Sequence, residues 1–236
     1  MQVIPVIDLR DGQVVHARRG DRDAYRPIRS ALCEGSAPID VVGGLLGVYP
    51  FATLYIADLD AIQRRGDSIA VIRDIRRAFP RLELWVDNGL ADVQTCRAWL
   101  AQGLGDLVLG SEAQTSPAIL EALADASRRI ILSLDHKDDR FIGPPTLRTT
   151  PAIWPPRIIA MTLSRVGSAA GPDLRLLDTL RRESPGRQIF AAGGVRGGED
   201  LQELMQRSIS GVLVATALHE RRIGRAEIAA AAAAPT

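Results

Sequence analysis

Residues 3–12 of the chain read VIPVIDLRDG, an apolar run that ends at Asp8 and is followed by Asp11 and Gly12. An open, doubly wound parallel sheet would use a similar first strand, but would place a glycine-rich phosphate loop directly after it. No such loop follows Ile7. The stretch therefore favours a closed (β/α)8 barrel over the open sheet, and in such a barrel functional side chains stand at the carboxyl ends of the strands.

Seven further short apolar runs follow the first one, and longer amphipathic stretches separate them. This alternation is typical of βα units around a buried parallel sheet. Eight units in 236 residues predict an α/β protein with a single TIM-barrel domain, whose alanine-rich tail at 226–236 extends the last helix or frays. The predicted strands are Val3–Ile7, Leu54–Ala57, Leu82–Val86, Leu107–Leu109, Ile130–Leu134, Arg157–Met161, Gln188–Ala192 and Gly211–Val214, and the clearest helices are Ser68–Phe79, Pro117–Ser127 and Leu174–Arg182.

An internal repeat supports the barrel. The short sequence motifs at 88–90 and 108–110 align with those at 193–195 and 213–215, in both cases at an offset of 105 residues. The word at 6–11 aligns with 133–138 at an offset of 127 residues. We therefore expect two duplicated half-barrels, the first of which carries about 22 extra residues between Arg18 and Pro50.

Composition narrows the classes of function. The chain has 46% apolar and 24% charged residues, which is typical of a protein with a folded core. Its 29 basic and 28 acidic residues nearly cancel, so the net charge gives no electrostatic attraction to nucleic acid or to an anionic membrane. Cys33 and Cys96 stand in no metal-binding spacing, which argues against a disulfide framework and a zinc site. No apolar run approaches the length of a membrane span. We expect a cytoplasmic protein.

The acids that end the strands are the candidate catalytic groups. Asp8 ends the first predicted strand and Asp135 the fifth, so a barrel would set them across its mouth as a general acid and a general base. The alternative is that each carboxylate only caps the turn that follows it. Asp58 and Asp87 end the second and third strands, and we expect both of them to contact the substrate. The acids show no recognisable ligand spacing, so no metal site is predicted.

A phosphate is the substrate group that the glycines favour. Gly193 and Gly194 follow the seventh strand and Thr216 follows the eighth, where barrels commonly bind phosphate through backbone N–H groups. By the half-barrel repeat, Gly110 and Ser111 predict a second anion pocket after the fourth strand. A substrate with a phosphate at each end would then place its middle over the two catalytic carboxylates.

Lys137 is the only lysine of the chain and follows Asp135 by two residues. It could bind a phosphate or, if desolvated, form a Schiff base with a carbonyl substrate. The competing interpretation is a solvated loop residue. His136 is a candidate proton carrier with the same reservation, whereas His16 and His219 are interpreted as structural.

The short sequence motifs at the predicted strand ends resemble those of the HisA/HisF family, which contains ProFAR isomerase and the cyclase subunit of imidazole glycerol phosphate synthase. The match runs nearly end to end, and the first-strand word is closer to the isomerase. The resemblance implies an Amadori rearrangement of an aminoaldose that carries two phosphates, without metal or organic cofactor. In it Asp8 would take the C2 proton and Asp135 would open the ribose ring. The matching words are 4–12, 57–60, 134–135, 164–168, 171–173 and 192–195.

The chain also departs from the family pattern. After the third strand the family has three glycines followed by Ile-Arg, but this chain has Asp87, Asn88, Gly89 and Leu90. That change puts a carboxylate where phosphate should bind and could remove several charge-assisted hydrogen bonds, each contributing roughly 1.5–3 kcal/mol. Arg19 and Arg165 are the remaining arginines that we expect to contact the substrate.

The leading hypothesis is a diverged isomerase or related proton-transfer enzyme that acts on a smaller or singly phosphorylated substrate. The chain resembles a divergent branch associated with biosynthesis of the one-carbon cofactors tetrahydromethanopterin and methanofuran. Three alternatives stay open: a genuine ProFAR isomerase, a lyase or condensing enzyme that uses Lys137, and a non-catalytic barrel subunit. The cyclase relative works with a glutaminase partner, so a partner protein is possible, and the sequence leaves the oligomeric state undetermined.

Overall fold

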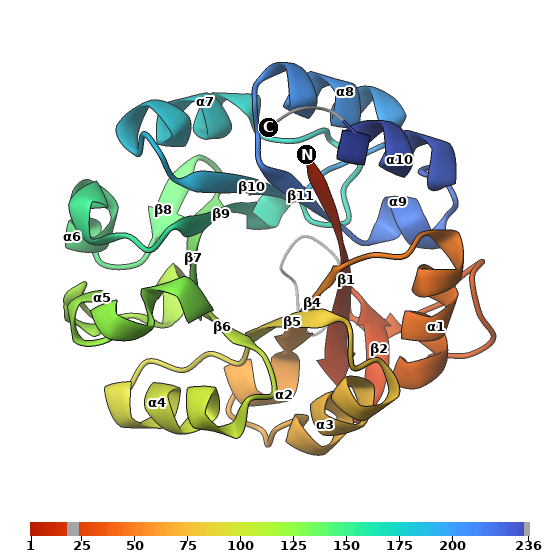
Figure 1. Cartoon of the computed structure of the whole chain (residues 1–236), viewed down its shortest axis with the longest axis horizontal. Coiled ribbons are helices and arrows are strands. Elements are labelled where there is room, and N and C mark those ends of the chain that lie inside the picture. The colour runs from red at the N-terminus through yellow and green to blue at the C-terminus, as the bar shows by residue number, and fades with distance from the viewer. Residues whose placement is uncertain (18–23, 234–236) are drawn as a thin grey trace.

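A computed structural model describes residues 1–17 and 24–233 of the chain. Eight parallel strands form a ring in which each strand pairs with its neighbours along the chain, and β1 closes the ring by pairing with β11 from Gln2 opposite Gly211 to Pro5 opposite Val214 (Figure 1). This closure confirms the (β/α)8 barrel and rules out the open sheet. The ring consists of β1 (Gln2–Arg10), β4 (Thr53–Asp58), β5 (Glu83–Asp87), β6 (Asp106–Gly110), β7 (Ile130–Lys137), β9 (Arg157–Thr162), β10 (Gln188–Ala192) and β11 (Gly211–Val214).

Helices surround the ring and bury their apolar faces against it (Figure 1). The expected helix at 117–127 is broken, because its α-helical part ends at Ala122 and 3-10 turns cover Ala124–Arg129. Residues 226–233 of the alanine-rich tail belong to the last helix, and the amino group of Met1 donates to the Ala231 carbonyl at 2.8 Å. The outer helices are α1 (Pro38–Val48), α3 (Ile69–Ala78), α4 (Val93–Gln102), α5 (Ala118–Ala122), α6 (Pro145–Thr149), α7 (Leu174–Glu183), α8 (Gly198–Gln206) and α10 (Arg225–Ala233), and the short ones at strand ends are α2 (Leu59–Ile62) and α9 (Thr216–His219).

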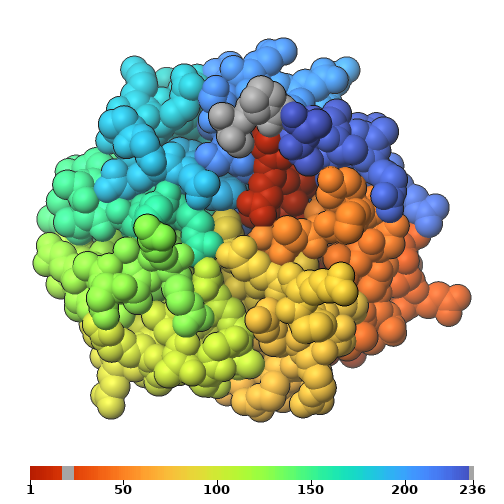
Figure 2. All heavy atoms as spheres, in the orientation of Figure 1, coloured from red at the N-terminus to blue at the C-terminus, as the bar shows by residue number. Residues whose placement is uncertain are grey.

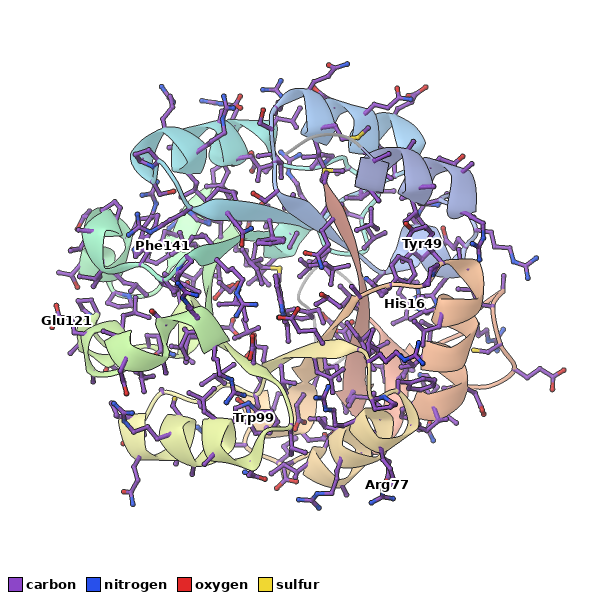
Figure 3. The ribbon with its side chains drawn as sticks, viewed as in Figure 1. His16, Tyr49, Arg77, Trp99, Glu121 and Phe141 are labelled. Atoms are coloured by element: carbon purple, nitrogen blue, oxygen red, sulfur yellow. The ribbon has the colours of Figure 1, made fainter. Side chains whose placement is uncertain are left out.

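The space-filling view shows the same contact between the two ends of the chain. The first residues of β1, in red, lie beside the dark blue residues of α10 in Figure 2. Helix α10 therefore packs against the start of β1. In Figure 3, Arg77 of α3 and Glu121 of α5 point outward from the ring of helices, whereas His16 lies inside it.

The two halves of the barrel repeat each other. Helices α3 and α7 start 105 residues apart, at Ile69 and Leu174, and strands β5 and β10 start at the same offset. At the offset of 127 residues, β1 and β7 each turn back into a short antiparallel strand, β2 (Gln13–His16) or β8 (Arg140–Ile142). Both hairpins turn through two residues with positive φ, Asp11 and Gly12 in one and Asp138 and Asp139 in the other.

The extra residues of the first half lie between β2 and α1. There the chain forms β3 (Arg26–Pro27), which pairs with β2, and then reaches α1 at Pro38. In the second half β8 ends at Ile142 and α6 begins at Pro145, so only two residues connect them. The duplicated barrel is therefore asymmetric at its mouth.

The inside of the barrel is filled and not a channel. Side chains from alternate strand positions pack there, and the rings of Trp85 and Phe190 meet edge to face with centroids 4.9 Å apart. Arg157 lies at the start of β9, with its guanidinium 5.1 Å from the Trp85 ring centroid and in ion pairs with Glu83 and Asp106 at 2.8 and 2.6 Å. These contacts are at the amino-terminal end of the strands, which is the end associated with stability in this fold.

Candidate active site

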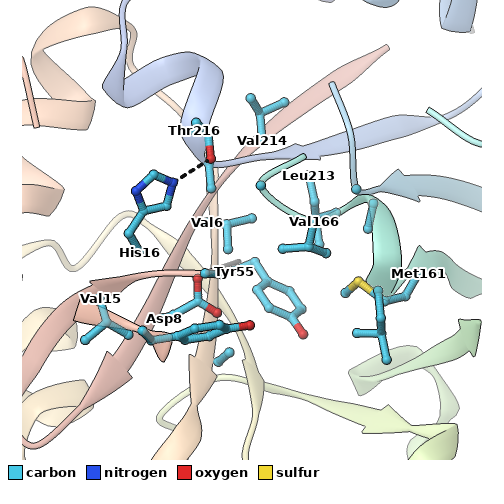
Figure 4. Close-up of a pocket in the computed structure, with 18 of the residues that line it drawn as sticks. Val6, Asp8, Val15, His16, Tyr55, Met161, Val166, Leu213, Val214 and Thr216 are labelled. Carbon is cyan, nitrogen blue, oxygen red and sulfur yellow. Dashed lines mark hydrogen bonds between the residues drawn. The ribbon is translucent and has the colours of Figure 1, made fainter. Parts of the chain in front are cut away.

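A pocket of about 290 Å³ lies at the carboxyl ends of the strands (Figure 4). It brings together most of the predicted site residues, because the ends of all parallel strands meet at the same edge of the barrel. Arg19 lies outside the described residues. The predicted residues that line the pocket are Asp8, Asp87, Asp135, Lys137, Gly193, Gly194 and Thr216, and those that do not are Asp58, Gly110, Ser111 and Arg165.

Asp8 and Asp135 face this pocket from opposite sides of the ring. Asp8 stands on β1 and Asp135 on β7, which are four positions apart in the closed order of eight strands. The two carboxyls occupy equivalent positions in the internal repeat. Asp8 pairs with Val15 in the first hairpin, and Asp135 pairs with Ile142 in the second. A small substrate between them can exchange protons with both.

Asp135 is held in a buried network. It is 4% exposed, and its Oδ2 accepts hydrogen bonds from the Ser111 hydroxyl and the Glu112 amide, both at 3.1 Å. Its Oδ1 accepts from the Ser133 hydroxyl at 2.7 Å. Burial raises the pKa of Asp135 to about 7, against the lowering effect of the Ser133 bond. A carboxyl with this pKa can carry a proton at neutral pH and deliver it, as a general acid must.

Tyr55 is a pocket residue that the sequence did not single out. It is 3% exposed, and its hydroxyl donates to Oδ2 of Asp87 at 3.3 Å. Burial raises the pKa of Tyr55 well above its ordinary value, and the charges of Asp87, Asp135 and Asp8 raise it further. The phenol therefore stays protonated between the carboxylates and serves as a hydrogen-bond donor. Figure 4 shows its ring in the pocket near Asp8.

Gly110 and Ser111, at the end of β6, were predicted to form an anion pocket but do not line the pocket seen here. Ser111 is 0% exposed; its hydroxyl lies 2.6 Å from the Ile142 carbonyl, and it also accepts a hydrogen bond from the Asp135 amide at 2.9 Å. The Glu112 amide is already bound to Asp135. A Cβ on Gly110 would stand 3.4 Å from a carboxylate oxygen of Asp135 and 3.5 Å from one of Asp87. The groups predicted to bind phosphate here are thus engaged with carboxylates, and the geometry gives that role no support.

Gly193 and Gly194 shape the opposite side of the pocket. Both have positive φ, of 106° and 85°. A Cβ on Gly193 would lie 2.6 Å from the Thr162 carbonyl oxygen, and one on Gly194 would lie 2.2 Å from that of Gly171. The backbone therefore passes so closely that these positions admit only glycine, and this leaves the peptide groups at the pocket surface.

Gly194→Ala is expected to lower the free energy of unfolding by about 2–5 kcal/mol, because it adds both left-handed strain and a backbone clash. The clash is with a carbonyl, which cannot rotate away as a side chain could. Gly186→Ala is the matched control, since Gly186 has φ of 81° and nothing within 4 Å of its added Cβ. Urea denaturation of both variants measures the difference. Equal losses in the two variants would contradict the close approach at Gly194.

Asp58 and Arg165, predicted to contact the substrate, do not line the pocket and hold backbone groups. Asp58 is 1% exposed, and its oxygens accept from the amides of Ala61 at 3.2 Å and Ser68 at 2.8 Å, so it fixes the start of α2. The Arg165 guanidinium donates to the carbonyls of Gly171 and Pro172 at 3.1 and 3.0 Å. Both side chains are turned into the backbone, and the sequence could not distinguish this from a place in the pocket.

Lys137 and His136 differ in their access to the pocket. Lys137 lines its rim and is exposed, which gives no desolvation of the kind that activates a Schiff-base lysine. His136 does not line the pocket; it packs on Phe141, and its Nδ1 lies 3.0 Å from the Leu134 carbonyl. Burial lowers the pKa of His136.

Residues from outside the strand ends complete the lining. His16 and His219 were interpreted as structural, yet both line the pocket, and Nε2 of His16 lies 3.2 Å from Oγ1 of Thr216 (Figure 4). Arg29 and Glu112 also line it. No sequence signal identified these four side chains, because their places depend on loop geometry. Within residues 1–17 and 24–233 no group of three His, Cys, Asp or Glu side chains could hold a metal ion, and no helix is long and apolar enough to cross a membrane.

Residues 2–224 match the family described as histidine biosynthesis protein. The chain belongs to this family. Its similarity to individual members extends over almost the full length of both proteins. It is 28% identical over 229 residues to an uncharacterized protein of Methanocaldococcus jannaschii, with 97% of each chain covered.

Other members of the histidine biosynthesis family carry the name of an activity. The chain is 24% identical over 242 residues to the ProFAR isomerase of Streptococcus sanguinis, with 97% of each covered, and 28% identical over 237 residues to that of Salinibacter ruber, with 93% of this chain and 89% of the relative covered. The full name of both is 1-(5-phosphoribosyl)-5-((5-phosphoribosylamino)methylideneamino)imidazole-4-carboxamide isomerase. These relatives support an isomerase in general terms.

Proposed function

We propose that this protein is a metal-independent isomerase that moves protons within a phosphorylated, sugar-like substrate, with Asp8 and Asp135 as its base and acid. The observation that carries the proposal is the placement of these two carboxyls on opposite strands of one pocket, with the pKa of Asp135 raised to about 7. The names of the relatives support the same class of reaction.

The proposed reaction is an Amadori rearrangement of an aminoaldose to an aminoketose. The Asp135 carboxyl gives its proton to the ring oxygen while the C1–O bond breaks and the nitrogen lone pair forms a C1–N double bond. Asp8 then takes the C2 proton, which leaves a C1–C2 double bond. Asp8 returns this proton to C1, and the C2 hydroxyl gives its proton to Asp135. Both carboxyls end as they began, so no oxidant or cofactor is required.

A substrate with one phosphate fits the pocket better than one with two. At the β6 end the Ser111 hydroxyl and the Glu112 amide are bound to Asp135, and Asp87 stands where the family pattern has glycine. At the other end Gly193, Gly194 and Thr216 line the pocket. We therefore place a single phosphate at the β10 and β11 end, which argues for divergence from the histidine enzyme. Assignment to one-carbon cofactor biosynthesis stays a prediction.

A genuine ProFAR isomerase is the second candidate, and similarity over nearly the whole length of both proteins favours it. Purified protein is assayed for turnover of ProFAR and of N-substituted ribosylamine 5-phosphates, with uptake of deuterium from D2O at C1 of the product as a second readout. We expect isomerisation of a singly phosphorylated compound and little turnover of ProFAR. Efficient turnover of ProFAR would establish the second candidate, and folded protein that is inert toward both would overturn the proposed reaction.

A further inference from the structure

Tyr55 of β4 and Asp87 of β5 form a hydrogen-bonded pair, and both line the pocket, where Figure 4 shows the Tyr55 ring. The phenol donates its proton to Oδ2 of Asp87 at 3.3 Å, and the Gly89 amide donates to Oδ1 of the same carboxylate at 3.1 Å. A phenol oxygen can accept one hydrogen bond while it donates another. The Tyr55 oxygen can therefore accept from a donor group of the substrate, with the Asp87 carboxylate beside it.

The surroundings of Tyr55 favour a donor with a positive charge. Burial raises the pKa of the phenol well above its ordinary value, and the charges of Asp87, Asp135 and Asp8, on three different strands, raise it further. The phenol therefore stays neutral, and the pair carries the negative charge of Asp87. In a half-buried pocket a fixed negative charge stabilises a cation more strongly than it would in water.

The pair stands across the pocket from the end at which we place the phosphate. In the closed order of eight strands, β5 is four positions from β10 in either direction. A ribose chain whose 5-phosphate lies at Gly193 and Gly194 therefore extends its C1 end toward Asp87. C1 carries the nitrogen of an aminoaldose, so this placement brings the nitrogen to the Tyr55–Asp87 pair.

The proposed acid lies next to the same pair. The Cβ that Gly110 lacks would stand 3.4 Å from Oδ2 of Asp135 and 3.5 Å from Oδ2 of Asp87, so the two oxygens border the same small space. In the substrate, the ring oxygen and the nitrogen are both bonded to C1. One substrate carbon can therefore present its ring oxygen to Asp135 and its nitrogen to Tyr55.

We propose that Tyr55 is a third catalytic residue, whose oxygen accepts a hydrogen bond from the C1 nitrogen and stabilises the iminium cation that forms when the ring opens. Asp87 is its positioning residue, because it holds the phenol proton and supplies the negative charge. The cation develops only as the C1–O bond breaks, so the contact is stronger in the transition state than in the bound aminoaldose. This inference rests on the rearrangement proposed above.

Binding of two stable analogues tests the cation contact without turnover. Calorimetry on the full chain compares 1-methylamino-1-deoxyribitol 5-phosphate, which carries an ammonium group where the iminium would form, with 1-O-methylribitol 5-phosphate, which is uncharged there. We expect the ammonium compound to bind about tenfold or more tightly, because its hydrogen bond is charge-assisted. Asp87→Asn and Tyr55→Phe should each remove most of this preference.

Two variants outside the pocket serve as matched controls. Asp74→Asn removes an exposed carboxylate of the outer helix α3, and Tyr49→Phe removes a hydroxyl at the end of α1, where the Tyr49 ring packs on Phe51. Neither residue lines the pocket. Both variants should keep the preference for the ammonium compound.

Reaction rates test the same contact during ring opening. We expect Tyr55→Phe to lower kcat roughly 10²-fold, as the loss of one stabilising hydrogen bond in a transition state commonly does. The ratio of kcat for N-(4-methoxyphenyl) over N-(4-nitrophenyl) ribosylamine 5-phosphate should rise in Tyr55→Phe and in Asp87→Asn, because an electron-donating ring replaces part of the lost stabilisation. A purely structural role would lower both rates equally and leave the ratio unchanged.

An equal affinity of the wild type for both analogues, or a preference that both variants keep, would overturn the inference. A preference lost in Asp87→Asn alone would overturn the contact through Tyr55, and one lost in Tyr55→Phe alone would overturn the role of Asp87. If the preference depends on both residues but no aminoaldose is isomerised, the cation contact stands and the proposed reaction fails. If an aminoaldose is isomerised and both variants keep the preference and the rate ratio of the wild type, the reaction stands and this inference fails.

Discussion

Asp8→Asn is expected to lower kcat by roughly 10²- to 10⁴-fold, because the carboxylate that takes the C2 proton is replaced by an amide that cannot. KM should change little, since Asn fills the same space and the proposed phosphate site is formed by other residues. The measurement is steady-state kinetics on the aminoaldose that the wild-type protein turns over. Uptake of deuterium from D2O at C1 of the product should be lost to the same degree, because the new C–H bond forms there.

Asp11→Asn is the matched control for this variant. Asp11 lies on the same hairpin, three residues further along, in a turn with φ of 50° that Asn tolerates, and its side chain is 87% exposed. It should keep full activity. The same pair of variants, placed in the chromosomal gene, tests the non-catalytic alternative: a barrel that serves only as an assembly subunit would give an unchanged cellular phenotype with Asp8→Asn, provided the variant folds.

The placement of Asp8 and Asp135 in the pocket was the feature of the site most open to prediction. Asp8 and Asp135 each end an apolar run, and the barrel rule places such residues at the mouth whatever the loops do. Asp58 also ends a strand but does not line the pocket. There the backbone turns directly into α2, and the side chain accepts from the amides of Ala61 and Ser68. Capping and substrate contact use the same residue type at the same place in the sequence.

The end of the pocket proposed to bind phosphate shows what the sequence could and could not predict. The glycine pair at Gly193 and Gly194 was visible because positive φ and close packing leave a composition signal. The places of Arg29 and His219 in the pocket were not predictable, because Ser30 and Ala31 reach α9 through hydrogen bonds between residues almost 190 positions apart. Periodicity carries no information on such contacts, so in the sequence an arginine that lines a pocket from an irregular segment resembles any solvated one.

Asp135→Asn is expected to abolish turnover and at the same time stabilise the protein at alkaline pH. Folding raises the pKa of this carboxyl from 3.8 to about 7, chiefly through burial, so the folded state holds the proton more tightly than the unfolded state does. Its favourable contribution to the free energy of unfolding is complete below about pH 4. The contribution is lost as the pH rises from about 4 to 7, where the folded protein must carry a buried charge. A shift of this size corresponds to several kcal/mol, at roughly 1.4 kcal/mol per pKa unit.

Asparagine removes that cost and keeps the contacts, since its amide oxygen can accept from the Glu112 amide and its NH2 group can donate to the Ser133 hydroxyl. Urea denaturation at pH 5 and pH 8 should therefore show Asp135→Asn gaining stability over the wild type by about 1–4 kcal/mol more at pH 8 than at pH 5. Asp138→Asn, an exposed turn residue of the same hairpin, should show no such gain.

In the wild type, activity should fall as the pH rises above about 7, because the acid is then deprotonated. A variant that loses activity but shows the same pH dependence of stability as the wild type would contradict a buried, proton-carrying Asp135. Loss of activity together with gained stability is the result expected of a residue whose burial serves the reaction and opposes folding.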